Sequence, residues 1–372
     1  MAFLSCSWFS SSLFLLFILM LAPYSTAQEA AGGGRRPLVP AMFVFGDSLI
    51  DNGNNNNLPS LAKANYFPYG IDFAGGPTGR FANGYTIADE IGELLGLPLI
   101  PPFSQVSGSI NNALNGVNYA SAAAGILDIS GRNFVSYNTF NQQIQNFAST
   151  MEDFNNFFGA QTAAESIARS VFFIGFGSND YLNNYLMPNY NTRFQYNGDQ
   201  FSDLLIQRYS KQLETLYSLG GRRFIIANVG VLGCIPYILS QNLSSHCSSE
   251  INNLVINFNG KLKPMLHNLN ENLPGSQFVH MDIYSMFKDI LENPRNYGFS
   301  VANRGCCGIG RNRGQISCLP LQPPCLNRDL YVFWDAFHPT SAVNIILARQ
   351  SFSGTSDIVS PMNIQQLVTL NP

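Results

Sequence analysis

Five short apolar runs, separated by segments of helical character, are the feature of this sequence that most constrains its fold. The runs cover residues 41–45, 117–120, 170–176, 223–229 and 277–283. A strand that is buried on both faces of a parallel sheet reads as a nearly continuous apolar run. Strands that alternate with helices are typical of βαβ units. The sequence therefore predicts a three-layer α/β/α sandwich around a five-stranded, mainly parallel sheet.

The segments between and after these runs carry apolar residues at helical spacing. The clearest is 199–219, where Phe201 and Leu205 begin an apolar face. We expect Asp199 to cap the start of this helix and Gly220 its end. The other predicted helices cover residues 87–95, 141–169 with a break near Gly159, 254–269, 284–291 and 340–350.

The first 28 residues carry no charged side chain, and Leu13 to Ala22 is an apolar run too short to span a bilayer. Ser25-Thr26-Ala27 then offers a small-x-small cleavage site. This pattern predicts a signal peptide over residues 1–27, with an uncleaved anchor as the alternative. No later stretch is long enough for a membrane helix and no linker divides the rest. We therefore expect a secreted, extracellular protein whose residues 28–372 form a single domain.

Six cysteines follow the predicted signal peptide, and an even number in a secreted chain indicates three disulfides. We expect the first two to pair across a short loop, and each of the adjacent third and fourth to reach either the fifth or the sixth. Zinc binding is the alternative, which the lack of two C-x-x-C pairs disfavours. In chain order the six are Cys234, Cys247, Cys306, Cys307, Cys318 and Cys325.

The loop between Cys234 and Cys247 holds the sequon Asn242-Leu243-Ser244, which predicts a glycan on Asn242.

The charge composition indicates which classes of partner the protein can bind. The net charge is -3 and the sequence has no basic cluster, which argues against nucleic acid as a partner. Only 12% of residues are charged and 13% are aromatic, which fits an apolar ligand or a large core.

A serine follows the first apolar run, where Gly46 ends the run and Asp47 and Ser48 come next. Open α/β sheets bind ligands at the carboxyl ends of their strands, so Ser48 is placed to act as a nucleophile. A histidine base would be His246, His267, His280 or His338. His338 is favoured because Asp335, three residues earlier, can orient one ring nitrogen while the other takes the proton of Ser48.

Two other roles for Asp335 fit the sequence less well. Asp335 and His338 could bind a metal ion, but no cluster of His, Cys or Glu offers further ligands, so no metal site is expected. Asp335 and Asp180 could form the carboxylate pair of a glycosidase, which leaves Ser48 and His338 without a function.

An acyl-transfer site also needs donors for a developing oxyanion. The backbone N–H of Ser48, the backbone N–H of Gly125 in a small-residue turn and the side-chain amide of Asn179 after the third run are suitable. The structural alternative is that Asn179 caps a turn and Gly125 serves only the turn.

A long loop, 52–83, carries five aromatic residues. They either line a substrate groove or, as we favour, pack the loop against the core: Tyr66, Phe67, Tyr69, Phe73 and Phe81.

Four blocks in this order resemble the GDSL esterase/lipases, also called SGNH hydrolases. The blocks are Phe45-Gly46-Asp47-Ser48-Leu49, Asn118-Tyr119-Ala120-Ser121 with Gly125, Gly177-Ser178-Asn179-Asp180, and Asp335-Ala336-Phe337-His338-Pro339. The surrounding segments resemble the plant branch: Asp51-Asn52-Gly53-Asn54-Asn55, Gly79-Arg80-Phe81-Ala82-Asn83-Gly84, Leu232-Gly233-Cys234-Ile235-Pro236 and Cys306-Cys307-Gly308. The resemblance extends from about Phe43 to the C-terminus.

The resemblance implies a flavodoxin-like α/β/α fold and a triad of Ser48, His338 and Asp335. It implies an oxyanion hole from Ser48, Gly125 and Asn179, and hydrolysis of carboxylic esters without a cofactor. Plant members are typically secreted, to the apoplast or cell wall, and act on lipid, cutin-related or acetyl esters. An acyltransferase with the same triad, and a non-catalytic wall or lipid-binding protein, are the alternatives.

Overall fold

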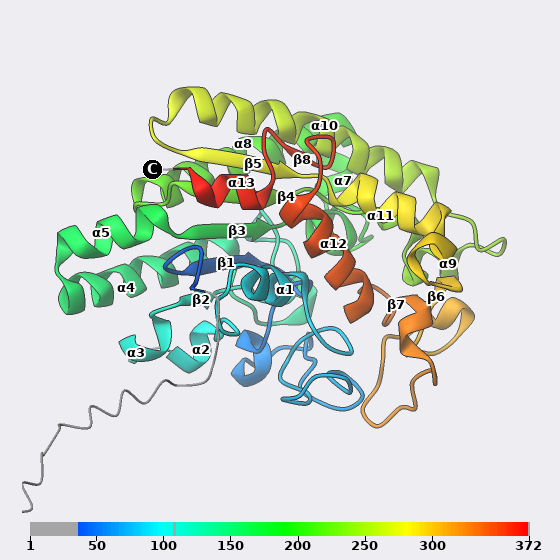
Figure 1. The fold of residues 1–372 in the computed structure, drawn as a ribbon. Coiled ribbons are helices and arrows are strands. Elements are labelled where there is room, and N and C mark those ends of the chain that lie inside the picture. Colours follow the sequence, from blue (N-terminus) through cyan, green and yellow to red (C-terminus); the bar gives the residue numbers. More distant parts are fainter. Residues whose placement is uncertain (1–35, 107–108, 371–372) are drawn as a thin grey trace, which may run out of the picture. The chain divides into compact units, whose positions relative to one another are not determined.

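A six-stranded sheet forms the centre of the computed structural model, which describes residues 36–106 and 109–370. Its strands follow the order β2-β1-β3-β4-β5-β8 (Figure 1). The first five are parallel, as predicted, and β8 pairs antiparallel with β5. The bounds are β1 Met42–Gly46, β2 Gly116–Asn118, β3 Val171–Gly175, β4 Arg223–Ala227, β5 Gln277–Met281 and β8 Val359–Ser360.

The predicted strand number of five is therefore wrong by one. The missed strand, β8, has two residues, which is too short to produce a periodic pattern in the sequence. The predicted signal peptide over residues 1–27 lies outside the described residues. The described residues from Arg36 onward form one compact unit.

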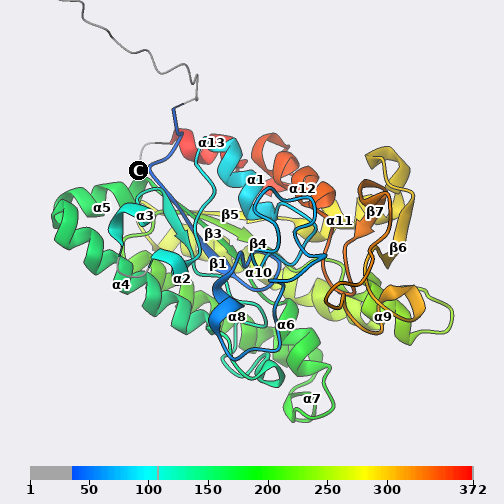
Figure 2. The ribbon, with the colours of Figure 1, turned by 90° about the horizontal axis from the view of Figure 1, so that it is seen from below.

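Helices cover both faces of the sheet, because alternate side chains of each strand point to opposite faces (Figures 1 and 2). Phe43 and Phe45 of β1 belong to one apolar core, and Met42 and Val44 belong to the other. The first core is completed by α4 (Phe140–Phe158), α5 (Ala160–Arg169), α8 (Gly198–Ser218) and α10 (Ser249–Asn272). The second is completed by α1 (Ile87–Leu94), α11 (Ile283–Glu292), α12 (Ser341–Ser353) and α13 (Ile364–Thr369).

The long predicted helices are present, with one corrected cap. The break at Gly159 is confirmed, where a φ of +82° suits glycine. The start of α8 is capped by Asn197 and not by Asp199, because the Asn197 side chain accepts hydrogen bonds from the backbone of Asp199 and Gln200. Shorter helices are α2 (Phe103–Val106), α3 (Ile110–Ala113), α6 (Ser178–Asp180), α7 (Thr192–Gln195) and α9 (Pro236–Gln241).

A small second sheet pairs β6 (Val301–Gly305) with β7 (Tyr331–Phe333) in the cysteine-rich region. Three disulfides are present: Cys234–Cys247, Cys306–Cys325 and Cys307–Cys318. These pairs leave none of the six cysteines available for zinc. No helix in the described part of the chain is long and apolar enough to cross a bilayer.

Candidate active site

The turn that follows β1 is held rigidly. Both polar groups of the Gly46 backbone bond to the side chain of Gln143, at 3.0 and 2.9 Å. A Cβ at Gly46 would lie 2.4 Å from Ile50 Cδ1 and 2.8 Å from the oxygen of Gly175, so only glycine fits here. The backbone N–H groups of Ile50 and Asp51 donate to the Asp47 carbonyl. Ser48 is therefore presented at the carboxyl edge of the sheet on a fixed backbone.

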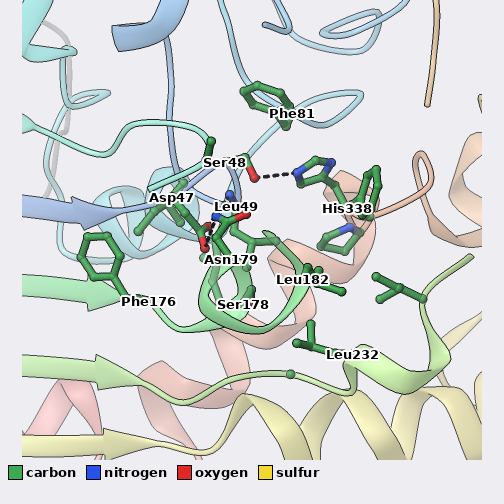
Figure 3. Close-up of a pocket in the computed structure, with 18 of the residues that line it drawn as sticks. Asp47, Ser48, Leu49, Phe81, Phe176, Ser178, Asn179, Leu182, Leu232 and His338 are labelled. Carbon is green, nitrogen blue, oxygen red and sulfur yellow. Dashed lines mark hydrogen bonds between the residues drawn. The ribbon is translucent and has the colours of Figure 1, made fainter. Parts of the chain in front are cut away.

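The structure brings Ser48, His338 and Asp335 together, from two segments of chain that lie 290 residues apart (Figure 3). Ser48 Oγ lies 2.8 Å from His338 Nε2. His338 Nδ1 lies 2.9 and 3.0 Å from the two carboxylate oxygens of Asp335. A serine, a histidine and a carboxylate linked in this order form an activated nucleophile.

Asp335 is fully buried and accepts several other hydrogen bonds. The backbone N–H groups of Phe337 and His338 donate to Oδ1 at 2.9 Å. The hydroxyls of Tyr69 and Ser317 donate to Oδ2 at 2.6 and 3.1 Å. Burial alone would raise the pKa of Asp335, but the neighbouring imidazole and these donors outweigh burial and lower the pKa below its usual value. The group therefore stays ionised beside His338.

Two of the three expected oxyanion donors line the cavity beside Ser48. Asn179 donates from Nδ2 to the Ala124 oxygen at 2.9 Å and to Asp47 Oδ2 at 3.3 Å, and it accepts from Asn183 at Oδ1. The backbone N–H of Ser48 has no acceptor within the described part of the chain. Ser48 and Asn179 are both among the residues that line the cavity.

Gly125 is not among the residues that line the cavity. A Cβ there would meet Asp180 Oδ2 and Ser130 Cβ at 2.7 Å, so this glycine packs closely against Asp180. Ala123 lines the cavity instead, with a φ of +78°, which is uncommon for a residue other than glycine. No oxygen in the described residues accepts from its N–H. An alanine gives no sequence signal for such a backbone, so Ala123 could not be predicted as a site residue.

Three buried carboxyl groups lie behind the site. Burial raises the pKa of Asp47 to about 7 and those of Asp51 and Asp180 to about 6, although each accepts backbone hydrogen bonds that oppose the shift. Asp180 accepts from the backbone of Ile126 and Leu127 and from Ser130, so it holds the small-residue turn. This structural role accounts for Asp180 without a glycosidase pair.

The aromatic residues of the long loop divide between the two expected roles. Tyr69 is buried and bonded to Asp335, and Phe81 packs on the His338 ring with 5.1 Å between ring centroids. Tyr66 lines the cavity and donates to the Cys318 oxygen. Phe73 packs under the guanidinium of Arg80, and Phe67 is 49% exposed.

The other three histidines lie elsewhere. His246 and His267 are exposed, and His280 lies in β5, where burial lowers its pKa to about 4. Over the described ranges, no group of three His, Cys, Asp or Glu residues is arranged to hold a metal ion. His338 bonds to Asp335 through one ring nitrogen and to Ser48 through the other, an arrangement that suits a nucleophile and its base.

The cavity at this site has a volume of about 250 Å³ and is mostly apolar. Figure 3 shows Phe81 on one side of the Ser48–His338 pair and Leu182 and Leu232 on the other. A nucleophile at the wall of an apolar cavity suits an uncharged substrate with a hydrocarbon part.

Comparison with known proteins agrees with this geometry. Residues 42–351 match the family model of the GDSL-like lipases/acylhydrolases. The chain is 60% identical to GDSL esterase/lipase At1g71691 of Arabidopsis thaliana, over 90% of this chain and 87% of that protein. It is 49% identical to GDSL esterase/lipase 7 of the same plant, over 96% of this chain and 99% of that protein.

The extent of these matches confirms both the resemblance and the α/β/α fold that it implies. From β1 through α12, the chain belongs to the GDSL-like lipase/acylhydrolase family and is an enzyme of the GDSL esterase/lipase type.

Proposed function

We propose that this enzyme hydrolyses carboxylic esters through an acyl-enzyme on Ser48. The observation that carries the proposal is the continuous hydrogen-bonded chain from Ser48 Oγ through His338 to Asp335, at 2.8 and 2.9 Å. His338 takes the hydroxyl proton as Ser48 Oγ bonds to the carbonyl carbon. His338 then returns that proton to the departing alcohol as the ester C–O bond breaks. Water, deprotonated by His338, then adds to the acyl carbon. The acyl C–O bond to Ser48 breaks, His338 returns the proton to Ser48 Oγ, and the acid is released.

The oxyanion that forms in each step needs fixed donors. We assign this role to the Ser48 N–H, the Asn179 side chain and one N–H of the small-residue turn. For the third donor we favour Ala123 over Gly125, because Ala123 lines the cavity and Gly125 does not; neither N–H has an acceptor in the described chain. The bond from Asn179 to Asp47 is the longer of its two, so an oxyanion can compete for that proton.

The same proposal includes the cellular context. We infer that residues 1–27 direct secretion to the apoplast or cell wall and that residues 28–372 form a single hydrolase domain. Three disulfides suit an oxidising compartment. Asn242 is exposed and available for a glycan. Substrates would be lipid, cutin-related or acetyl esters.

The test uses the full chain and its Ser48→Ala variant. The wild type should hydrolyse p-nitrophenyl esters and react with a fluorophosphonate probe, and mass spectrometry should locate the phosphonyl group on Ser48. The variant should lose both properties while its circular dichroism spectrum stays unchanged. Full turnover by Ser48→Ala would refute the mechanism. Failure of the probe to label a folded wild type would favour a non-catalytic protein, and transfer to an added alcohol in preference to water would favour an acyltransferase.

A further inference from the structure

The cavity beside Ser48 continues into the layer between the central sheet and helices α11 and α12. Its inner wall is formed by Phe173 of β3, Ala227 of β4, Phe287 of α11 and Leu347 of α12. All four side chains belong to the second apolar core and none is more than 8% exposed. The cavity therefore leads from the nucleophile into the interior of the protein.

Small residues at the ends of two neighbouring strands make room for this inner part. Gly175 of β3 and Ala227 of β4 lie side by side, and both line the cavity. Two residues earlier on the same face, Phe173 and Ile225 are large and fill the layer. A Cβ at Gly175 would be in ordinary contact, 3.7 Å from Ala227 and 3.9 Å from Ile50, so no neighbouring side chain occupies its place.

The polar side chains on the inner wall already have partners within the protein. Asn228 donates to Asp282 at 2.8 Å and accepts from the Tyr284 backbone at 3.0 Å, and Asn344 donates to the Tyr85 oxygen. Lys63 also lines the cavity; it is half-buried and donates to the Asn56 oxygen. The rest of the inner wall is apolar, so a hydrocarbon chain suits this part of the cavity best.

We propose that this inner part, called the chamber below, is the binding site for the acyl chain of the ester. The enzyme therefore prefers acyl groups of several carbons over acetyl. This inference rests on the proposed function. The acyl chain stays attached to Ser48 until water arrives, whereas the alcohol must leave first to make room for that water. If the alcohol lay in the chamber, the surrounding core would hold it there, and water could not reach the acyl group on Ser48. The chain that enters the chamber is therefore the acyl chain, and the alcohol leaves through the outer opening.

The activity test compares p-nitrophenyl esters of acyl length C2 to C16 with a series of alkyl acetates of rising alcohol length. For the wild type, kcat/KM should rise about fourfold per methylene, the factor that corresponds to ~0.8 kcal/mol, until the chamber is full. The acetate series should stay flat. A rise along the acetates and not along the acyl series would place the alcohol in the chamber and overturn the assignment.

Variants locate the effect. Ala227→Leu should shorten the preferred acyl chain, whereas Leu347→Ala should lengthen it. Leu213→Ala is the matched control, because Leu213 is a buried helical leucine in the core on the opposite face of the sheet. It should lose stability without changing chain preference. Equal losses on all esters in Ala227→Leu, or the same preference in all three variants, would refute the inference.

A binding measurement separates this inference from the proposed catalysis. The Ser48→Ala variant should bind cis-parinaric acid, detected by its fluorescence, and fatty acids should displace it more effectively as they lengthen. Ala227→Leu added to Ser48→Ala should weaken this binding at least tenfold. Parinaric acid binding that Ala227→Leu leaves unchanged would overturn the acyl site even if ester hydrolysis is confirmed.

Discussion

The Tyr69 hydroxyl donates a 2.6 Å hydrogen bond to Asp335 Oδ2, across 266 residues of sequence. Tyr69 thereby joins the long loop after β1 to the carboxylate that is hydrogen-bonded to His338. Its ring packs edge-on against Trp334 and Phe81, so the position of the hydroxyl is fixed by the buried aromatic cluster. With Tyr69 and Ser317 on one oxygen and two backbone N–H groups on the other, Asp335 has little freedom to rotate.

Tyr69→Phe should lower kcat about tenfold or more and leave KM nearly unchanged, because a hydrogen bond to a charged group contributes about 1.5–3 kcal/mol. Loss of the donor should also raise the pKa of Asp335, because the Tyr69 hydroxyl helps to hold that pKa below its usual value. Tyr66→Phe is the control, since Tyr66 in the same loop donates to the Cys318 oxygen and not to Asp335. Equal effects of the two variants would show a general loop role.

Asn179→Ala should cost about 3 kcal/mol of transition-state stabilisation, which is 10²–10³ in kcat, if its amide is an oxyanion donor. The same amide also donates to the Ala124 oxygen, so a purely structural role is the competing explanation. Steady-state kinetics and urea unfolding of the same variant distinguish the two. A lower free energy of unfolding with normal kcat would return Asn179 to the structural role.

The buried carboxyl of Asp47 should make stability depend on pH. Burial raises its pKa to about 7, while backbone Leu49 and the charge of His338 oppose the shift and Asp180 and Asp51 add to it. The native state therefore holds this proton more tightly than the unfolded chain. At pH values below 3.8, the pKa of the unfolded chain, Asp47 does not lower the free energy of unfolding. As pH rises from there, the free energy of unfolding falls, and the loss reaches about 4 kcal/mol once pH exceeds 7.

Asp47→Asn should remove this contribution. The fall in unfolding free energy between pH 5 and pH 8, measured by urea titration, should be smaller in Asp47→Asn than in the wild type by roughly 3 kcal/mol. Asp51 and Asp180, whose pKa values are also raised, remain in the variant and keep part of the slope. Parallel pH dependences in the two proteins would contradict the assignment to Asp47.

The sheet could be predicted because strands buried on both faces leave continuous apolar runs, as in β1 and β3. The serine and its histidine could be proposed because strand ends and a tight Asp-x-x-His turn are local features of sequence. The two-residue strand β8 has no such pattern, since its pairing with β5 depends on tertiary contact.

The contacts that complete the site carry no local signal. The bond from Tyr69 to Asp335 joins two segments far apart in sequence, and the backbone of Ala123 has a positive φ that alanine does not indicate. Asn197 and Asp199 both fit the sequence pattern for the cap of α8. Only the exact start of the helix, which the sequence does not show, decides in favour of Asn197.

The buried ion pair of Arg80 and Asp89 should anchor the loop that carries Phe81 to the His338 ring. Arg80 donates to both oxygens of Asp89, at 2.8 and 2.7 Å, and both side chains are at most 5% exposed. Asp89 also accepts from the N–H and hydroxyl of Thr86, which cap α1. Arg80→Met should lower the free energy of unfolding by about 3–5 kcal/mol, because it leaves Asp89 charged and unpaired in the interior.

Arg193→Met is the matched control, since Arg193 pairs with Glu250 at the surface and both side chains are more than half exposed. Its loss should cost less than about 1 kcal/mol. Replacing Arg80 and Asp89 together by methionine should recover much of the stability lost in Arg80→Met, because no unpaired buried charge remains. Urea unfolding of the four proteins measures this. If Arg80→Met were no less stable than Arg193→Met, the pair would not anchor the loop, and the position of Phe81 over His338 would depend on its apolar contacts alone.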